Sequence, residues 1–337
     1  MLESIREMNS NETGFDAVIV CCSTEHQATY WGERLVQTRG SACKKDALVY
    51  AVCEDWTNKD GAGNGLGTLY AYAKAKKLAE AKDAKDLDLI LSNGGSIGLY
   101  HTAGKGTRLA PLPGAENNNK PGGKLPAVVE VSREARNLTI LEAVVRQTNR
   151  YAKERPGRVS VFWGDQIFIP SAGHNKSGEH HADILAVMGP MPNETEWNEK
   201  GFSNYGLIAV NGENEATQVE KVSHATASEL LKSFGSVKQV GPSLGSFSLG
   251  HEMLSLMLSE FENELAGKCA KFVSVPHFLL PLTMTSTISQ CGGKVFKIKM
   301  ATNPHSFNDV YAMNGETDVR EAYAMGDKAH ADCKKKI

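Results

Sequence analysis

Short runs of apolar, often β-branched residues alternate with helix-like segments, and this alternation constrains the fold more than any other feature of the sequence. The apolar runs lie at residues 16–22, 46–54, 87–95, 158–169 and 182–189. Runs of this length and composition predict buried strands. Strands that alternate with helices predict an α/β fold built on an open, mostly parallel, Rossmann-like sheet.

Helices are expected at residues 23–39, 60–81 and 138–154, where apolar or alanine-rich spacing is helical. Glycine-rich loops at 61–68 and 101–126, and the acid Asp165, follow predicted strands. In open α/β sheets, ligands bind beyond the carboxyl ends of the strands. We therefore expect both loops and Asp165 at one edge of the sheet.

The second half of the chain has shorter strands and fewer helices, which predicts either a mixed sheet that extends the first or a lid-like lobe over it, within the same domain. One amphipathic helix is expected at 250–268. The shorter strands are expected at 202–211, 217–223, 272–282 and 294–301. The domain prediction is a flexible N-terminus at 1–14, a nucleotide-binding core at 15–188, a mixed-sheet, sugar-binding part at 189–325 and a tail at 326–337.

Composition excludes several classes of partner. The formal net charge of -2 over 337 residues gives no general attraction to nucleic acid or an anionic membrane. A basic stripe with interleaved aromatic residues is missing. Neither an 18-residue apolar stretch nor a signal peptide is apparent. Seven cysteines without a CxxC pair indicate reduced thiols and a cytoplasmic protein. A removed transit peptide would leave no trace, so organelle import and the number of subunits stay open.

The loop after the third predicted strand fails two common nucleotide-binding patterns. The P-loop pattern G-x-x-x-x-G-K-[ST] fails because Lys105 is followed by Gly106 and because Leu99 stands where the first glycine belongs. The earlier loop fails the dinucleotide pattern G-x-G-x-x-G, because the third glycine would fall on Leu66 or Thr68. Neither a P-loop nor a dinucleotide fingerprint is therefore expected.

Residues 103–112, AGKGTRLAPL, match another pattern. They resemble the signature G-x-G-T-R-L-x-P-L of the sugar-1-phosphate nucleotidyltransferases, the nucleotide-sugar pyrophosphorylases. Ala103 departs from the pattern, because the family has a further glycine near that position. The resemblance implies a GT-A-like nucleotidyltransferase fold, Mg²⁺ as cofactor, and an NTP and a sugar 1-phosphate as the bound partners.

The chemistry of the loop agrees with this resemblance. Bare glycine backbone lets amide groups approach phosphate oxygens, and arginine offers a planar, permanently charged fork. The resemblance implies that Arg108 and Lys124 act on the triphosphate, although Lys120 competes with Lys124. We prefer Lys124 because the next expected strand and helix follow it directly. The implied nucleotide-binding residues of this loop are Gly104, Lys105, Gly106 and Thr107.

Two acids are candidate Mg²⁺ ligands. Gly164 and Asp165 follow the apolar residues 159–163 and resemble the family's Gly-Asp, whose acid holds the metal and takes part in catalysis. Taken alone, Asp165 also fits an acid that caps a turn. The segment around Asp309 resembles the family's D-V-G-T, although Tyr311 stands in place of glycine. Mg²⁺ needs few carboxylates when phosphate oxygens complete its shell.

The segments NYGLIAV and QVEKV resemble the family's sugar-side pair. The resemblance places Tyr205 and Gly206 against the sugar, Glu220 at a sugar hydroxyl and Lys221 at the sugar phosphate. A solvated strand edge is the other interpretation of Glu220 and Lys221. Both interpretations stay open at the level of sequence.

The order of the segments suggests a permutation. The family's G-T-x-x-A-L-like turn follows its third strand, but here GLGTLYAYAKA comes before the phosphate loop. The turn would place Gly65, Gly67 and Thr68 near the base. The strands at 16–22 and 46–54 resemble the family's second and third strands. The N-terminal part is similar to fucose-1-phosphate guanylyltransferases and to the pyrophosphorylase half of bifunctional fucokinases, so we expect a permuted strand order.

The predicted function is transfer of a nucleotidyl group from an NTP to a sugar 1-phosphate. A non-catalytic relative that binds a nucleotide or nucleotide sugar as a regulatory or assembly subunit is the alternative, because Ala103 and Tyr311 depart from the family pattern. A third possibility keeps the reaction but changes the acceptor to a non-sugar phosphate. The sequence does not identify the NTP or the sugar.

Overall fold

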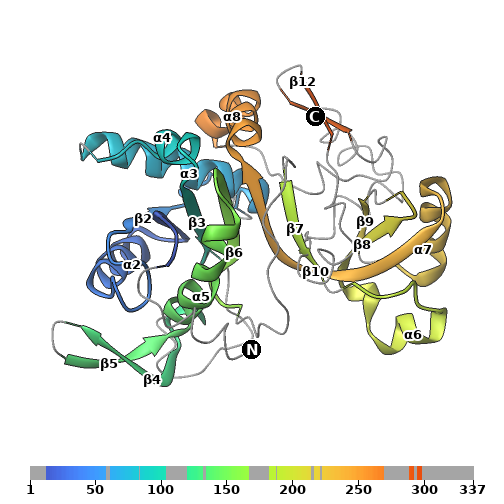
Figure 1. Ribbon diagram of the computed structural model, residues 1–337, viewed down its shortest axis with the longest axis horizontal. Helices are drawn as coiled ribbons and strands as arrows, with labels where there is room; N and C mark the ends of the chain where they lie inside the picture. Colours follow the sequence, from blue (N-terminus) through green and yellow to red (C-terminus); the bar gives the residue numbers. More distant parts are fainter. Residues whose placement is uncertain are drawn as a thin grey trace. The chain divides into compact units, whose positions relative to one another are not determined.

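The structure is a computed structural model, and the part of the chain it describes forms two compact units. The first takes the described residues within Met1–Thr57 and Gly67–Lys176, and the second those within Asn58–Leu66 and Ser177–Ile337. Figure 1 shows the elements of both units. The described residues are 13–57, 61–82, 84–103, 120–131, 134–166, 182–186, 188–213, 216–220, 222–268, 288–291 and 294–297.

Four parallel strands form the sheet of the first unit. They are β1 (Ala17–Cys22), β2 (Leu48–Cys53), β3 (Ser96–His101) and β6 (Arg158–Trp163), in the spatial order β2-β1-β3-β6. Every residue of β1 and β3 is buried. A strand covered on both faces has no polar side, which explains the uninterrupted apolar run of β1. The prediction of an α/β fold with an open, mostly parallel sheet is confirmed.

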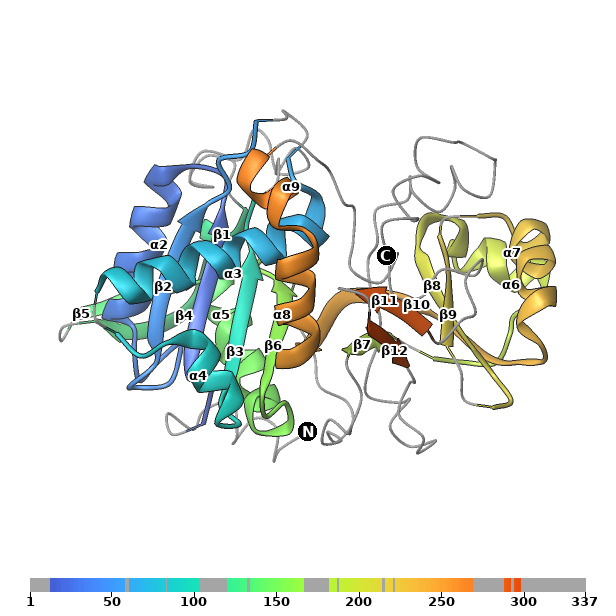
Figure 2. The same ribbon diagram turned by 90° about the horizontal axis from the view of Figure 1, so that it is seen from above.

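Helices cover both faces of this sheet (Figure 1, Figure 2). The helices α2 (Glu25–Gln37) and α5 (Ile140–Thr148) lie on one face, and α3 (Gly63–Ala81) and α4 (Leu87–Ser92) lie on the other. A 3-10 helix at Asn149–Glu154 continues α5. The predicted helices at 23–39, 60–81 and 138–154 are therefore present, the last with a tighter final part.

The strand predicted at 87–95 is wrong. This segment forms α4, and the strand is β3, which begins at Ser96. The Asp86 side chain accepts a hydrogen bond from the Asp88 backbone and begins the helix, and Gly94 follows its end with a φ of 79°. Capping by Asp86 and Gly94 favours a helix over the strand that the apolar run predicts. The run is also not buried throughout, since Leu89 is 56% exposed.

A hairpin lies between β3 and α5, and only its first strand, directly at Lys124, was expected from the sequence. It pairs β4 (Lys124–Val131) with β5 (Glu134–Thr139) in antiparallel fashion, after a 3-10 turn at Lys120–Gly122. A small core packs its inner side against α5. This core consists of Val129, Val131, Leu138 and Ala143, with Leu125 partly buried against it.

Antiparallel strands form the sheet of the second unit. The 14-residue strand β10 (Val237–Gly250) pairs with β8 (Gly206–Asn211) and with β7 (Ala182–Ala186), and β8 pairs with β9 (Ala216–Glu220). The ladder between β10 and β7 shifts register near Gly245, whose φ is 84°. The strands predicted at 182–189, 202–211 and 217–223 are present in shorter form, but β10 was not predicted.

Short helices complete this unit around one apolar core. They are α6 (Glu194–Glu199), α7 (His224–Leu231) and 3-10 turns at Phe202–Asn204 and Lys232–Phe234. The fully buried indole of Trp197 packs with Leu207, Ala209, Val219, Val222, Ala227, Leu231, Phe234 and Val240. The core thus joins α6 and α7 to the β8–β9 hairpin.

The helix predicted at 250–268 consists of two helices, α8 (His251–Glu260) and α9 (Glu262–Gly267), which meet at Phe261. A further hairpin pairs β11 (Ile288–Cys291) with β12 (Lys294–Lys297). The prediction at 294–301 therefore holds over the first four residues, and residues 272–282 lie outside the described part. No helix in the described part of the chain is both long enough and apolar enough to cross a membrane.

Candidate functional site

The carboxyl edge of the parallel sheet carries several of the candidate residues that the structure describes. Because β2, β3 and β6 run in the same direction, the residues after them emerge at one edge. Residue 103 enters the GKGTRL segment there, two residues after β3, and Asp165 follows β6 there. This is the position at which open α/β sheets bind ligands.

His101 is the last residue of β3 and the centre of this edge. Its side chain is 5% exposed, and its Nε2 lies 2.9 Å from Oγ1 of Thr68 on α3. Burial lowers the pKa of His101 to about 4, so the ring is neutral at physiological pH. The ring also packs against the indole of Trp163, with 5.6 Å between centroids. The end of β3 is thereby joined to α3 and to β6.

Gly67 leaves room for the Glu54 carboxylate where α3 approaches β2 and β3. A Cβ at position 67 would lie 2.9 Å from Oε2 of Glu54 and 3.4 Å from Cε1 of His101. Gly65, Gly67 and Thr68 are already helical, because α3 begins at Gly63. The glycine turn that the sequence analysis placed near the base is therefore the first part of a helix. It brings Gly67 and Thr68 beside the carboxyl ends of β2 and β3.

The segment that leads into the GKGTRL loop is fixed to the strand beside it. The carbonyl of Cys21 accepts hydrogen bonds from the Thr102 amide at 2.8 Å, the Thr102 hydroxyl at 2.8 Å and the Ala103 amide at 3.1 Å. On the other side, the Gly164 amide donates to the His101 carbonyl at 2.8 Å. The backbone is thus held on both sides up to residue 103.

Gly164 precedes the candidate metal ligand Asp165 and is explained by packing. A Cβ on Gly164 would lie 2.8 Å from Cγ2 of Thr102 and 3.0 Å from Cδ1 of Leu141. The Gln166 amide donates to the Trp163 carbonyl at 3.3 Å and closes a turn, on which Asp165 is exposed. The turn therefore presents a carboxylate at the sheet edge.

An exposed carboxylate at this edge fits one ligand of Mg²⁺, which takes one or two carboxylates together with phosphate oxygens and water. Within the described residues, no group of three or more His, Cys, Asp or Glu side chains is placed to hold a metal ion. Asp165 therefore stays a predicted Mg²⁺ ligand.

Thiols lie beneath this edge but are poor nucleophiles. Cys21, Cys22 and Cys53, at the carboxyl ends of β1 and β2, are free and buried, as is Cys43 before β2. Burial raises the pKa of Cys22 to about 12, and burial and the neighbouring Glu54 carboxylate raise that of Cys21. The Cys21 thiol donates to Oε2 of Glu54 at 3.8 Å. These thiols are protonated and pack as small apolar groups.

Lys124 is exposed at the start of β4, where it is opposite Thr139 in the ladder with β5. Its competitor Lys120 begins the preceding 3-10 turn. Several predicted residues lie outside the described part of the chain, so their contacts with Lys124 or Asp165 stay predictions. They are Gly104, Lys105, Gly106, Thr107, Arg108, Lys221 and Asp309.

The second unit brings the predicted sugar-side residues together. Gly206, the first residue of β8, is directly opposite Glu220, the last residue of β9. Tyr205 precedes Gly206 and is 44% exposed. Two segments that were proposed from separate motifs are therefore neighbours at one end of the β8–β9 hairpin.

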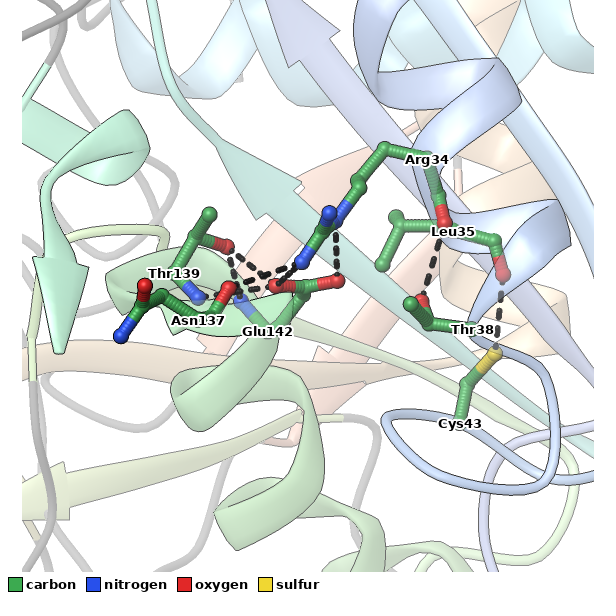
Figure 3. Close-up of polar contacts among 7 residues, drawn as sticks. All are labelled: Arg34, Leu35, Thr38, Cys43, Asn137, Thr139 and Glu142. Atoms are coloured by element: carbon green, nitrogen blue, oxygen red, sulfur yellow. Dashed lines mark hydrogen bonds and ion pairs between the residues drawn. The ribbon is translucent and has the colours of Figure 1, made fainter. Parts of the chain in front are cut away.

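The sequence analysis missed a buried polar network beneath the β4–β5 hairpin. Figure 3 shows Arg34 of α2 facing Glu142 of α5, with Asn137 and Thr139 beside them. Thr139 and Glu142 form a capping box at the start of α5. The T-x-x-E pattern before an apolar run could have indicated this box, but nothing local indicates that Arg34 is its partner.

Comparison with known proteins identifies no family for this chain. Neither the protein-family models nor the curated proteins with which the sequence was compared give a match.

Proposed function

We propose that the chain is a Mg²⁺-dependent sugar-1-phosphate nucleotidyltransferase, which forms a nucleotide-diphospho-sugar and pyrophosphate from an NTP and a sugar 1-phosphate. The proposal starts from the GKGTRL segment, residues 104–109. The observation that supports it best is the 2.9 Å contact between Thr68 and His101. This contact brings the proposed base-side segment beside the strand that enters the proposed phosphate loop.

The strand order supports the proposed permutation. The strand before the GKGTRL segment resembles the family's first strand, and β1 and β2 resemble its second and third. In space, β3 lies beside β1, and β1 lies beside β2. Strands that are consecutive in an unpermuted relative would thus be neighbours here, as consecutive strands usually are.

In the proposed reaction, an oxygen of the sugar 1-phosphate attacks the α-phosphorus of the NTP, and the bond from that phosphorus to the pyrophosphate oxygen breaks. Glycine amides of the loop bind phosphate oxygens, and Arg108 and Lys124 neutralise the charge that develops on pyrophosphate. Asp165 would hold Mg²⁺, which supplies further positive charge at the phosphates. Catalysis then needs no nucleophilic side chain.

The test is pyrophosphate release with Mg²⁺ over a grid of the four NTPs and a panel of sugar 1-phosphates. Arg108→Ala and Asp165→Ala should each lower kcat/KM by a factor of about 10²–10³, by analogy with other charge-stabilising contacts. Arg136→Ala and Asp46→Ala are matched controls, because both side chains are solvent-exposed. Release by one pair of substrates, lost in the first two variants and kept in the controls, is the expected result.

The alternative of a non-catalytic nucleotide-binding subunit predicts a different result. Ala103 and Tyr311 depart from the family pattern and favour it. In that case no pair of substrates releases pyrophosphate, although a nucleotide or nucleotide sugar still binds. Replacing both residues by glycine would then be the first attempt to restore activity.

A further inference from the structure

A buried ion pair joins α2 to the start of α5 (Figure 3). The Arg34 guanidinium donates to both oxygens of Glu142, with distances of 2.7 Å from Nε to Oε1 and 3.0 Å from Nη2 to Oε2. Glu142 is 0% exposed and Arg34 is 8% exposed. The hydrogen bond that Arg34 donates to Glu142 is the main cause that raises the pKa of Arg34, so the guanidinium stays charged. Two full charges are thus fixed in one geometry away from water.

One route of hydrogen bonds leads from this pair to the start of β4 through Glu142. Its Oε2 accepts from the Thr139 amide at 2.8 Å and from the Thr139 hydroxyl at 2.9 Å. Thr139 is opposite Lys124 in the ladder, and the next amide, that of Ile140, donates to the Gly123 carbonyl at 2.9 Å. The carboxylate is therefore connected to Gly123, the residue before Lys124, through Thr139 and the backbone of Ile140.

A second route runs through Arg34 itself. Its Nη2 donates to the Asn137 carbonyl at 2.9 Å, and the Asn137 side-chain amide donates to the Leu125 carbonyl at 2.9 Å. The ladder between β4 and β5 shifts register between Lys124 and Val128. Register shifts of this kind change the direction of a strand and of its side chains. The Arg34–Glu142 pair thus holds the hairpin on both sides of the shift.

Stability alone does not explain such a pair. Removing charges from water costs free energy, and apolar residues of similar volume often replace a buried ion pair without loss of stability. Apolar residues cannot form the two sets of hydrogen bonds that connect positions 34 and 142 to the β4–β5 ladder on both sides of its register shift. The geometry of the hairpin is therefore the property that this pair controls.

We infer that Arg34 and Glu142 are positioning residues that set where Lys124 meets the triphosphate. This inference rests on the proposed function, in which Lys124 contacts the phosphates that leave. Neither Arg34 nor Glu142 touches substrate. They act by fixing the backbone at Gly123 and Leu125, on either side of Lys124.

The experiment measures binding of inorganic pyrophosphate with Mg²⁺ by calorimetry, since pyrophosphate is the leaving group of the proposed reaction. The double variant Arg34→Met/Glu142→Met leaves the Thr139 amide without its acceptor, so its melting temperature should fall, but no further than that of Leu91→Ala, and it should bind pyrophosphate about tenfold more weakly. Lys124→Ala should weaken binding to a similar extent. The triple variant should bind no more weakly than Lys124→Ala, because the pair acts through Lys124.

Leu91→Ala is the matched control, because it removes a buried side chain of α4 outside the network. It should lower the melting temperature and leave pyrophosphate affinity within about twofold, since lost stability by itself moves no phosphate contact. Affinity that is unchanged in the double variant overturns the inference. A triple variant whose loss of pyrophosphate affinity is the product of the losses in the double variant and in Lys124→Ala also overturns it.

Hydrogen exchange separates this inference from the proposed function. The Ile140 amide, which donates to Gly123, should exchange at least about tenfold faster in the double variant than in the unaltered protein. If the unaltered protein binds no pyrophosphate, the proposed function fails and so does the role of Lys124 in it. If the Ile140 amide still exchanges faster in the double variant, the ion pair controls the hairpin backbone but not phosphate binding. If its exchange is unchanged, this part of the inference fails as well.

Discussion

Nε2 of His101 lies 2.9 Å from Oγ1 of Thr68, and this contact joins the end of the central strand β3 to the helix α3. The histidine is neutral because burial lowers its pKa to about 4. In the unfolded chain the same ring has a pKa of about 6.5. The unfolded state therefore binds more protons between these two values, and folding stability depends on pH there.

We predict that the free energy of unfolding falls as the pH is lowered from about 6.5 to about 4, and that His101 contributes up to about 3 kcal/mol of this fall. Urea unfolding at pH 7 and pH 4.5 measures it. In His101→Gln the fall should be smaller, because the titrating ring is gone. His26→Gln, at an exposed position of α2, should show the same fall as the unaltered protein. Equal falls in all three proteins would contradict the prediction.

Gly164→Ala should destabilise the protein by about 1–3 kcal/mol, the range for overpacking a filled site. The added methyl would lie 2.8 Å from Cγ2 of Thr102 and 3.2 Å from the backbone carbonyl of His101. Urea unfolding followed by circular dichroism measures the loss. Gly212→Ala is the control, since a Cβ there meets no atom within 4 Å. An equally small effect of both substitutions would show that the packing at Gly164 is loose.

Asp86→Ala should lower the free energy of unfolding by about 1 kcal/mol, because the Asp86 side chain caps α4. The same measurement on Asp46→Ala, at an exposed position, should show a change below about 0.5 kcal/mol. NMR chemical shifts of residues 87–92 provide a second test. We expect chemical shifts typical of a helix. Chemical shifts typical of an extended strand would contradict α4 and support the strand that the sequence predicted.

The buried thiols should resist alkylation in the folded protein. At pH 8, iodoacetamide should leave Cys21, Cys22, Cys43 and Cys53 unmodified, because burial keeps them protonated and covered. Peptide mass spectrometry after timed labelling makes the measurement. The same cysteines should be labelled in urea, which is the control. Rapid labelling of Cys22 in the native protein would mean that the end of β1 is open to solvent.

Three of the four parallel strands, β1, β2 and β6, could be predicted because they are short apolar runs, whereas β3 was expected one segment too early. β1 and β6 are buried almost throughout, so the sequence itself marks them. The hairpin β4–β5 could not be found this way, because β5 begins with exposed polar residues. β10 contains Pro242 and several glycines, which usually indicate loops, and it is a strand because β7 and β8 pair with it.

The candidate site was predicted only as far as local patterns extend. The alternation of strands and helices predicts parallel strands, and parallel strands place residue 103 and Asp165 at the same edge of the sheet. The contact of Thr68 with His101 and the pairing of Arg34 with Glu142 join residues far apart in sequence. No periodicity or motif marks such partners, since only the packed sheet and its helices bring them together.

The position of β3 in the sheet also sets when the candidate site can form during synthesis. β1 and β2 leave the ribosome first, and β1 keeps one edge without a partner until residues 96–101 follow. β6, which carries Asp165 at its end, is made later still. An open strand edge is a place where nascent chains associate wrongly. The edge of β1 therefore stays open until β3 is made, and the carboxyl edge gains Asp165 only after β6 has been made.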